Sequence, residues 1–141
     1  MTRKASAVWR GGLKDGKGTI SSESGVLKDT QYSFSTRFEN GIGTNPEELV
    51  AAAHAGCFSM AFSAELGKAG ITPESIRTTA TITMDKTDAG WTITESHLDV
   101  AAKIPVVDPA KFTSAANAAK AGCPISRLLK ANVTMDAKLE A

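Results

Sequence analysis

The chain opens with short runs in which apolar and polar residues alternate. Ala5–Trp9 and Gly18–Ser22 are β-compatible runs, separated by Gly and Asp turn residues. In a third run, Gln31–Phe38, the alternation places Tyr32 and two phenylalanines on one face and Arg37 on the other. This pattern predicts three strands in the first third of the chain.

A strong helix start follows at residues 43–48. Asn45 suits the N-cap, Pro46 suits the first helical position, and Glu48 completes a capping-box-like pair. The helix should run to about Gly67. Its residues are apolar or small almost all the way round, which is typical of a central helix that is covered on every side.

The same segment is the one candidate for a membrane span. Leu49–Leu66 is long enough, but it is mostly alanine and contains five polar or charged residues: His54, Cys57, Ser59, Ser63 and Glu65. We therefore expect the buried helix of a soluble protein, with no membrane partner.

The pattern then returns to strands. Ile76–Met84 alternates apolar and polar residues, and Asp88-Ala89-Gly90 is a turn signal, so a hairpin is predicted. In the returning strand the apolar set changes phase between Ile93 and Leu98. Such a change indicates a bulge or a change of the covered face.

Two helices and a strand close the chain. Asp108 is the predicted N-cap of a helix over Pro109–Ala121, and Pro124–Lys130 reads as a short third helix. Val133–Leu139 alternates and should be a half-buried strand. The element order predicts a single α+β domain over residues 1–141, with a mainly antiparallel sheet.

Composition narrows the function classes. Hydrophobic residues make up 42% of the chain, and 16 basic residues against 15 acidic ones leave a net charge of +1. Charge therefore gives no indication of a nucleic-acid partner. The N-terminus has no apolar run that would make a signal peptide, so we expect a cytoplasmic protein. Two cysteines in a reducing compartment argue against a structural disulfide framework.

The two cysteines are candidates for chemistry. Cys57 lies in the middle of the long helix, where a thiol is often a small buried packing residue. Cys123 precedes Pro124 and is placed at a helix N-cap, where the unpaired backbone N–H groups favour a thiolate. The residues themselves leave both the inert and the reactive interpretation open.

Charged neighbours allow further interpretations. Arg37 is either a solvated surface charge or, if it approaches Cys57, a group that lowers the thiol pKa. Glu47 suits the first turn of the long helix, where a carboxylate is favoured by the helix dipole. His54 is either a core histidine or, with Cys57 and Cys123, part of a zinc site that still needs a fourth ligand.

Three segments carry a resemblance to a known family. They are residues 43–49 (GTNPEEL), 51–61 (AAAHAGCFSMA) and 120–126 (KAGCPIS). The sequence resembles the OsmC/Ohr family, that is, osmotically inducible protein C and organic hydroperoxide resistance proteins. The likeness extends over nearly the whole chain, and it favours the OsmC branch because the matching arginine is Arg37, in the strand predicted before the long helix.

The resemblance implies a thiol-dependent peroxidase that reduces hydroperoxides, preferentially organic ones, to alcohols. It assigns Cys57 as the peroxidatic residue and Cys123 as the resolving one, with Arg37 and Glu47 as the charged pair that activates the first thiol. It implies no bound cofactor. The reductant is an external dithiol such as a lipoylated protein, and the fold is an OsmC-like intertwined homodimer around a long buried central helix.

Spacing adds one expectation to this picture. Glu47 and Cys57 are ten residues apart, so a straight helix separates them by about 15 Å along its axis. If both belong to one active site, Glu47 comes from the partner subunit and each site is composite. The sequence leaves open which subunit supplies Arg37.

Apolar residues near the cysteines suggest the substrate class. Four of them could line an approach for alkyl or fatty-acid hydroperoxides: Phe58, Met60, Phe62 and Ile125. The alternative from another class is a non-catalytic module, in which both cysteines are inert packing residues and a hydrophobic ligand occupies the interface.

Overall fold

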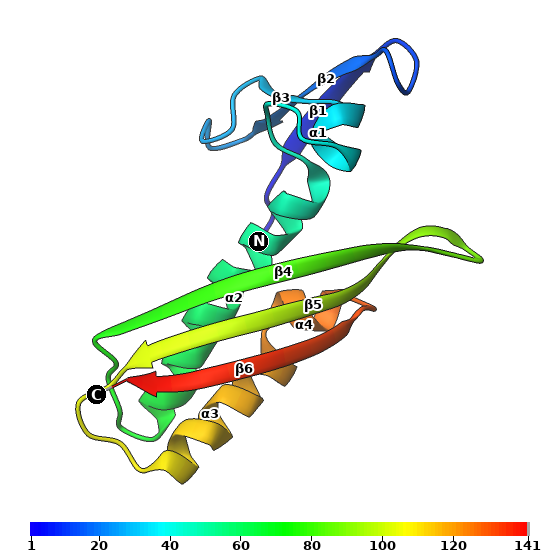
Figure 1. The fold of residues 1–141 in the computed structure, drawn as a ribbon. Helices are drawn as coiled ribbons and strands as arrows, with labels where there is room; N and C mark the ends of the chain where they lie inside the picture. The colour runs from blue at the N-terminus through cyan, green and yellow to red at the C-terminus, as the bar shows by residue number, and fades with distance from the viewer. Residues whose placement is uncertain (141) are drawn as a thin grey trace. The chain divides into compact units, whose positions relative to one another are not determined.

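The computed structural model describes residues 1–140, which form an α+β fold as predicted (Figure 1). The chain divides into two compact units, Met1–Leu49 and Val50–Ala141, and each is described by itself. Each unit contains one three-stranded sheet. Whether the two units fold as one domain stays a prediction.

The first unit is built on an antiparallel sheet with the strand order β1-β2-β3. Its strands are β1 (Ala5–Arg10), β2 (Lys17–Ser22) and β3 (Thr30–Tyr32). The first two strands confirm the alternation pattern. The third ends six residues earlier than the alternation predicts, because a short helix begins directly after it.

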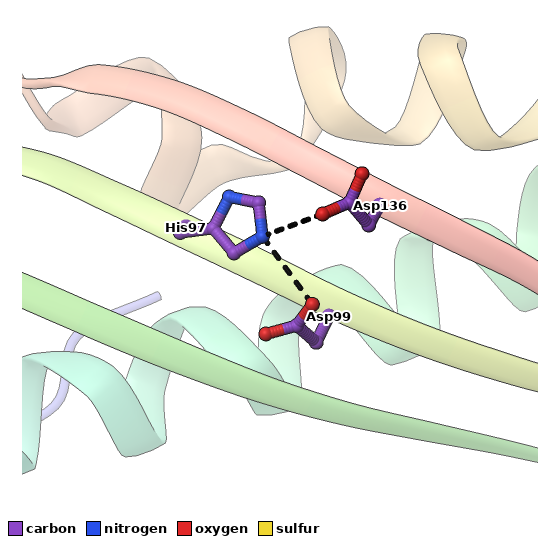
Figure 2. Close-up of side chains that lie close together, drawn as sticks. All are labelled: His97, Asp99 and Asp136. Atoms are coloured by element: carbon purple, nitrogen blue, oxygen red, sulfur yellow. Dashed lines mark hydrogen bonds and ion pairs between the residues drawn. The ribbon is translucent and has the colours of Figure 1, made fainter.

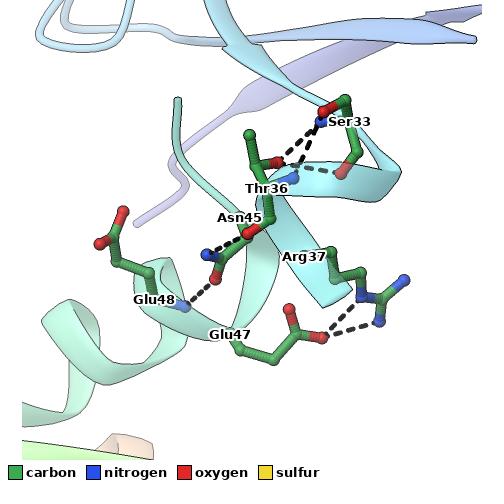
Figure 3. A network of polar contacts seen from close by, with 6 residues as sticks. All are labelled: Ser33, Thr36, Arg37, Asn45, Glu47 and Glu48. Carbon is green, nitrogen blue, oxygen red and sulfur yellow. Dashed lines mark hydrogen bonds and ion pairs between the residues drawn. The ribbon is translucent and has the colours of Figure 1, made fainter. Parts of the chain in front are cut away.

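The prediction of a strand through Phe38 is wrong, because α1 (Phe34–Phe38) is helical. Ser33 and Thr36 form a reciprocal capping box: the Thr36 N–H donates to Ser33 Oγ at 3.3 Å, and the Ser33 N–H donates to Thr36 Oγ1 at 2.8 Å (Figure 3). These local side-chain bonds stabilise a helix start that apolar alternation does not reveal. Arg37 therefore lies on a helix and not on a strand.

Helix α2 (Pro46–Lys68) begins where the capping signals place it. The Glu48 N–H donates to Asn45 Oδ1 at 2.7 Å, which confirms Asn45 as the N-cap (Figure 3). The Glu48 carboxylate accepts a hydrogen bond from the Thr44 hydroxyl at 2.8 Å. The first turn of α2 is thus fixed by its own side chains before any packing is considered.

The second unit is built on a sheet with the strand order β4-β5-β6. β4 (Ser75–Thr87) and β5 (Gly90–Lys103) form the predicted antiparallel hairpin. Thr83 pairs with Glu95 and Met84 pairs with Ile93, so the register is irregular at Thr94, within the stretch of β5 where the phase change predicted a bulge or a change of the covered face. β6 (Asn132–Glu140) pairs parallel to β5. The sheets are therefore mainly, but not wholly, antiparallel.

Two helices connect β5 to β6 and lie on the same face of the sheet as α2 (Figure 1). They are α3 (Pro109–Gly122), capped by the Asp108 side chain as predicted, and the short α4 (Pro124–Leu128). Parallel strands need such a crossover, because a tight turn cannot connect them. Cys123 is at once the C-cap of α3 and the N-cap of α4.

The core lies between these helices and the inner face of the sheet. One stripe of α2 is buried at four-residue spacing by His54, Phe58, Phe62 and Leu66. The sheet contributes alternate residues of β5, and α3 contributes Phe112 and three alanines. Phe62 is central to this cluster, with its ring 5.7 Å from that of Phe58 and 5.5 Å from that of Phe112, measured between centroids.

The prediction that α2 is covered on every side is not met within the chain. Outside the buried stripe its residues are exposed or half-exposed, and Met60 is 78% exposed. The reason is geometric, because a sheet packed with α3 covers only one side of a helix. Among the described residues, α2 is also the one helix long and apolar enough, by length and composition alone, to cross a bilayer.

The core predicts the effect of truncating Phe62. Phe62→Ala should lower the free energy of unfolding by about 3–5 kcal/mol, because the change leaves a cavity among fully buried side chains. Val106→Ala is the matched control: its side chain is 89% exposed, and we expect a change below about 0.5 kcal/mol. Urea unfolding of both variants beside the parent measures this, and equal losses would contradict the placement of the core.

Candidate functional site

The sulfur atoms of Cys57 and Cys123 lie 2.8 Å apart. Both cysteines are free, and their thiols share a hydrogen bond. A disulfide has an S–S distance of about 2.0 Å, so less than 1 Å of approach separates the pair from a covalent bond. Residues 66 positions apart in the sequence thus bring their sulfur atoms into direct contact within one chain.

The junction of two helices places Cys123. Its backbone N–H donates to the Ala119 carbonyl at 2.9 Å, which ends α3, and its carbonyl accepts from the Arg127 N–H at 3.0 Å, which starts α4. Pro124 at the first helical position has no N–H, so it suits this junction. The Cys123 side chain makes no capping bond and instead contacts Cys57.

The two thiols differ in exposure. Cys123 is fully buried in the core, whereas Cys57 is half-buried. A molecule from solvent therefore reaches the sulfur of Cys57 more readily than that of Cys123. Chemistry that needs one accessible thiol and one sheltered thiol fits this arrangement.

The surroundings of Cys57 favour its neutral form. Burial raises the pKa of the Cys57 thiol, and the hydrogen bond with Cys123 raises it further whenever Cys57 supplies the shared proton. A hydrogen bond with the backbone of Ile125 acts in the opposite direction. The net shift of the Cys57 pKa is upward.

Arg37 and Glu47 lie together in the first unit (Figure 3). The Nε and Nη2 atoms of Arg37 both lie 2.8 Å from Glu47 Oε1. Arg37 also stacks on Phe38, with its guanidinium carbon 5.4 Å from the ring centroid. The family resemblance implied that these two residues form a charged pair, and the structure brings them into contact.

The second oxygen of the Glu47 carboxylate differs from the first in its surroundings. Glu47 Oε2 is buried and, among residues 1–140, has no partner. A buried acceptor without a donor is costly, so this atom needs an explanation in any account of the site.

His54 does not join a zinc site with the two cysteines. Its ring is fully buried, with Nδ1 2.6 Å from Ser96 Oγ and Nε2 2.7 Å from Ser126 Oγ. Both nitrogens are therefore engaged by hydroxyl groups. In the described part of the chain, the side chains that cluster closely enough to bind a metal ion are His97, Asp99 and Asp136. The core-histidine interpretation holds.

That other cluster is His97 with Asp99 and Asp136, to which sequence reasoning assigned no role (Figure 2). Asp99 and Asp136 are register partners on the parallel strands β5 and β6. His97 Nε2 lies 3.3 Å from the first carboxylate and 3.2 Å from the second. The three side chains could together reach a divalent ion, but both carboxylates are exposed.

Comparison with known proteins shows which family this chain belongs to. The family described as OsmC-like protein matches residues 39–138. Peroxiredoxin OsmC of Escherichia coli is 52% identical over 139 residues, which cover 99% of this chain and 97% of that protein. The chain belongs to the OsmC family.

A second relative is more distant. Organic hydroperoxide resistance protein OhrB of Bacillus subtilis is 33% identical over 124 residues, covering 87% of this chain and 88% of that protein. Its crystal structure superposes with a TM-score of 0.68 at 26% identity, covering 97% of this chain and 98% of that chain. The higher identity to the E. coli protein agrees with the OsmC branch.

The difference in exposure between the thiols predicts selective labelling. A short pulse of N-ethylmaleimide on the reduced protein should modify Cys57 and leave Cys123 largely unmodified until the protein is unfolded in urea. Peptide mapping by mass spectrometry reads out each position. The Cys57→Ser variant is the control, and faster labelling of Cys123 than of Cys57 in the parent would contradict the geometry.

Proposed function

We propose that this protein is a thiol-dependent peroxidase that reduces hydroperoxides to alcohols through the Cys57–Cys123 pair. The observation that carries the proposal is the 2.8 Å contact between the two sulfurs. The names of its relatives support the reaction class, since they include a peroxiredoxin and organic hydroperoxide resistance proteins.

The cycle uses one accessible and one sheltered thiol. The Cys57 thiolate attacks the outer oxygen of the O–O bond, the alkoxide leaves and takes a proton as the alcohol, and Cys57 becomes a sulfenic acid. The Cys123 sulfur then attacks the Cys57 sulfur, water leaves, and a disulfide forms. An external dithiol returns both residues to thiols by exchange.

Exposure supports this assignment of roles. The first step needs contact with a substrate from solvent, and Cys57 is the more accessible thiol. The second step needs a thiol that meets the sulfenic acid before another molecule does, and the buried Cys123 already contacts Cys57. Reversed roles would require the hydroperoxide to enter the core.

Arg37 supplies the positive charge that Cys57 lacks in its own unit. A guanidinium near the sulfur would oppose the effect of burial, lower the pKa of Cys57 and also bind an oxygen of the substrate. The ion pair with Glu47 fixes the orientation of the guanidinium. Arg37 and Glu47 are thus the proposed activating pair.

This pair comes from the partner subunit of a homodimer. Glu47 precedes Cys57 by ten residues on the continuous helix α2, so the two side chains of one chain lie about 15 Å apart along that helix. The exposed, alanine-rich side of α2 is the proposed contact between subunits, since burial in a dimer would remove it from water. The unpaired Glu47 Oε2 would find its donor there.

Organic hydroperoxides are the proposed preferred substrates, but two of the four residues expected to line the approach do not do so. Phe58 and Phe62 are fully buried, whereas Met60 is exposed and Ile125 is half-buried. The first unit instead has a hollow of about 230 Å³ beside Arg37. It is lined mostly by apolar and aromatic side chains, namely Trp9, Leu13, Tyr32, Phe34 and Phe38, with Ser33. Such a wall suits an alkyl group attached to the peroxide.

The proposed cycle also has requirements for a cofactor, a reductant and a cellular location. The cycle needs no bound cofactor, because oxidation of the two thiols to a disulfide supplies the two electrons that reduce the hydroperoxide. The reductant is a dithiol, of which a lipoylated protein is one example. The cytoplasm is the proposed location, since its reducing conditions keep both thiols free between turnovers.

Substitution of each cysteine separates the two steps. Cys57→Ser should reduce consumption of cumene hydroperoxide in the presence of a dithiol to the rate without protein, because no sulfenic acid forms. Cys123→Ser should consume one equivalent and then stop, with Cys57 trapped as a sulfenic acid that dimedone labels. Sustained turnover by Cys57→Ser would end the proposal.

Complementation tests the composite site. Cys57→Ser and Arg37→Ala should each be inactive alone. Co-expression should restore roughly a quarter of the parental activity, because half of the dimers are mixed and each mixed dimer holds one intact site.

The control for this experiment is co-expression of Cys57→Ser with Cys123→Ser. That mixture should recover no sustained turnover, because both substitutions fall on the same chain's thiol pair. If the Arg37→Ala mixture also recovers nothing while mixed dimers are shown by mass spectrometry, Arg37 acts on the cysteine of its own chain.

A further inference from the structure

His54 connects the two segments that carry the cysteines. It lies on α2, three residues before Cys57, and its Nε2 is 2.7 Å from the hydroxyl of Ser126. Ser126 lies on α4, three residues after Cys123. The two segments are therefore joined twice, once through sulfur and once through imidazole and hydroxyl, with one helical turn between the two contacts. The second contact is called the His54–Ser126 bridge below.

The ring of His54 is held from its other side as well. Nδ1 lies 2.6 Å from Ser96 Oγ on β5, so the imidazole is fixed between the sheet and α4. Burial lowers the pKa of His54, so the ring is neutral, with one nitrogen as donor and the other as acceptor. A hydroxyl group can fill either role, so both serines satisfy the ring.

A neutral ring excludes an electrostatic role. An uncharged imidazole gives a thiolate little stabilisation, and both ring nitrogens of His54 contact serine hydroxyls. Instead, the His54–Ser126 bridge fixes the distance between α2 and α4, and therefore between the segments that carry the two cysteines. The bridge contains no group that the redox cycle consumes, so it persists when the sulfur contact changes from hydrogen bond to sulfenic acid and then to disulfide.

We propose that His54 is a positioning residue, which through Ser126 holds the Cys123 segment at bonding distance from Cys57. This inference rests on the proposed peroxidase function and names a further residue of the same site. The step that it serves is attack of the Cys123 sulfur on the Cys57 sulfenic acid, in which an S–S bond forms, the S–O bond breaks and the oxygen leaves as water. Its rate depends on the effective concentration of one thiol at the other.

A looser Cys123 segment has a chemical signature. When the disulfide forms slowly, the sulfenic acid survives long enough to meet a second hydroperoxide, which oxidises Cys57 to sulfinic acid. The second hydroperoxide is the oxidant for this step and leaves as a second alcohol. The bridge should therefore determine how Cys57 divides between disulfide and sulfinic acid, whereas a merely structural hydrogen bond would leave that ratio unchanged.

Ser126→Ala tests the bridge and keeps His54 in place. The matched control is Ser59→Ala: Ser59 also lies on α2, and its hydroxyl is 2.8 Å from Thr78 Oγ1 on β4, but it makes no bond to α4. Each variant loses one side-chain hydrogen bond between two elements. Ser126→Thr, which keeps the hydroxyl, is the conservative rescue.

Two readouts are measured for each variant. The first is the ratio of sulfinic acid to disulfide at Cys57 after addition of excess cumene hydroperoxide without reductant, quantified by mass spectrometry. The second is the equilibrium of the Cys57–Cys123 disulfide with glutathione, which requires no peroxidase activity. Both report on effective concentration, and the second does so even if the protein does not reduce hydroperoxides.

Ser126→Ala should raise the sulfinic fraction and weaken the disulfide equilibrium about tenfold, which equals about 30 mV for this two-electron couple. Ser59→Ala should match the parent, and Ser126→Thr should restore at least part of the shift. Equal shifts in Ser126→Ala and Ser59→Ala, or no shift in the glutathione equilibrium, would overturn the inference. A parent protein whose thiols do not react with hydroperoxide would instead refute the proposed function, while the glutathione equilibrium still decides the role of the bridge.

Discussion

The contact between the sulfurs of Cys57 and Cys123 is the interaction on which the proposed chemistry of this protein depends. Neither residue creates it alone. Cys123 lies where α3 ends and α4 begins, and Cys57 lies on α2, beside the buried stripe that packs against the sheet. Two features of the sequence determine these positions. A proline starts α4 directly after Cys123, and a stripe of large apolar residues packs α2 against the sheet beside Cys57. A thiol pair built in this way has a separation set by the fold and not by the flexibility of a loop.

This placement comes with an electrostatic cost. The packing that brings the sulfurs together also raises the pKa of Cys57, which opposes formation of the thiolate that a peroxidase needs. In the proposed mechanism, separate residues meet the two requirements. Cys57 and Cys123 provide the sulfurs, and Arg37, which is paired with Glu47, would provide the positive charge. The proposed homodimer would unite them, so formation of the assembly and activation of the thiol would be linked.

Local capping signals made much of the fold predictable. Asn45 and Asp108 use their side chains to accept N–H groups from the first turns of α2 and α3, and such bonds are readable from sequence because they span only two or three residues. The same logic explains the error over Phe34–Phe38. The Ser33 and Thr36 pair was present in the sequence, but aromatic alternation took precedence in the prediction, and the capping box decides the structure.

Features that depend on distant segments could not be predicted in this way. The resemblance named both cysteines and the charged pair, yet the partners of His54 come from β5 and α4, which no local pattern connects to α2. The His97 cluster requires the register of β5 against β6, and a shift of one residue would move Asp136 to the other face. Coverage of α2 was overestimated because composition shows which residues avoid water but not what covers them.

The most direct test of the central claim is the stoichiometry of a single turnover. One equivalent of cumene hydroperoxide is added to the reduced protein without reductant, and the alcohol, the free thiols and the disulfide-linked peptides are quantified. The account predicts one alcohol and the loss of both thiols per chain, with the Cys57 peptide linked to the Cys123 peptide of the same chain. Alcohol formation without that intrachain disulfide in the unsubstituted protein would contradict it.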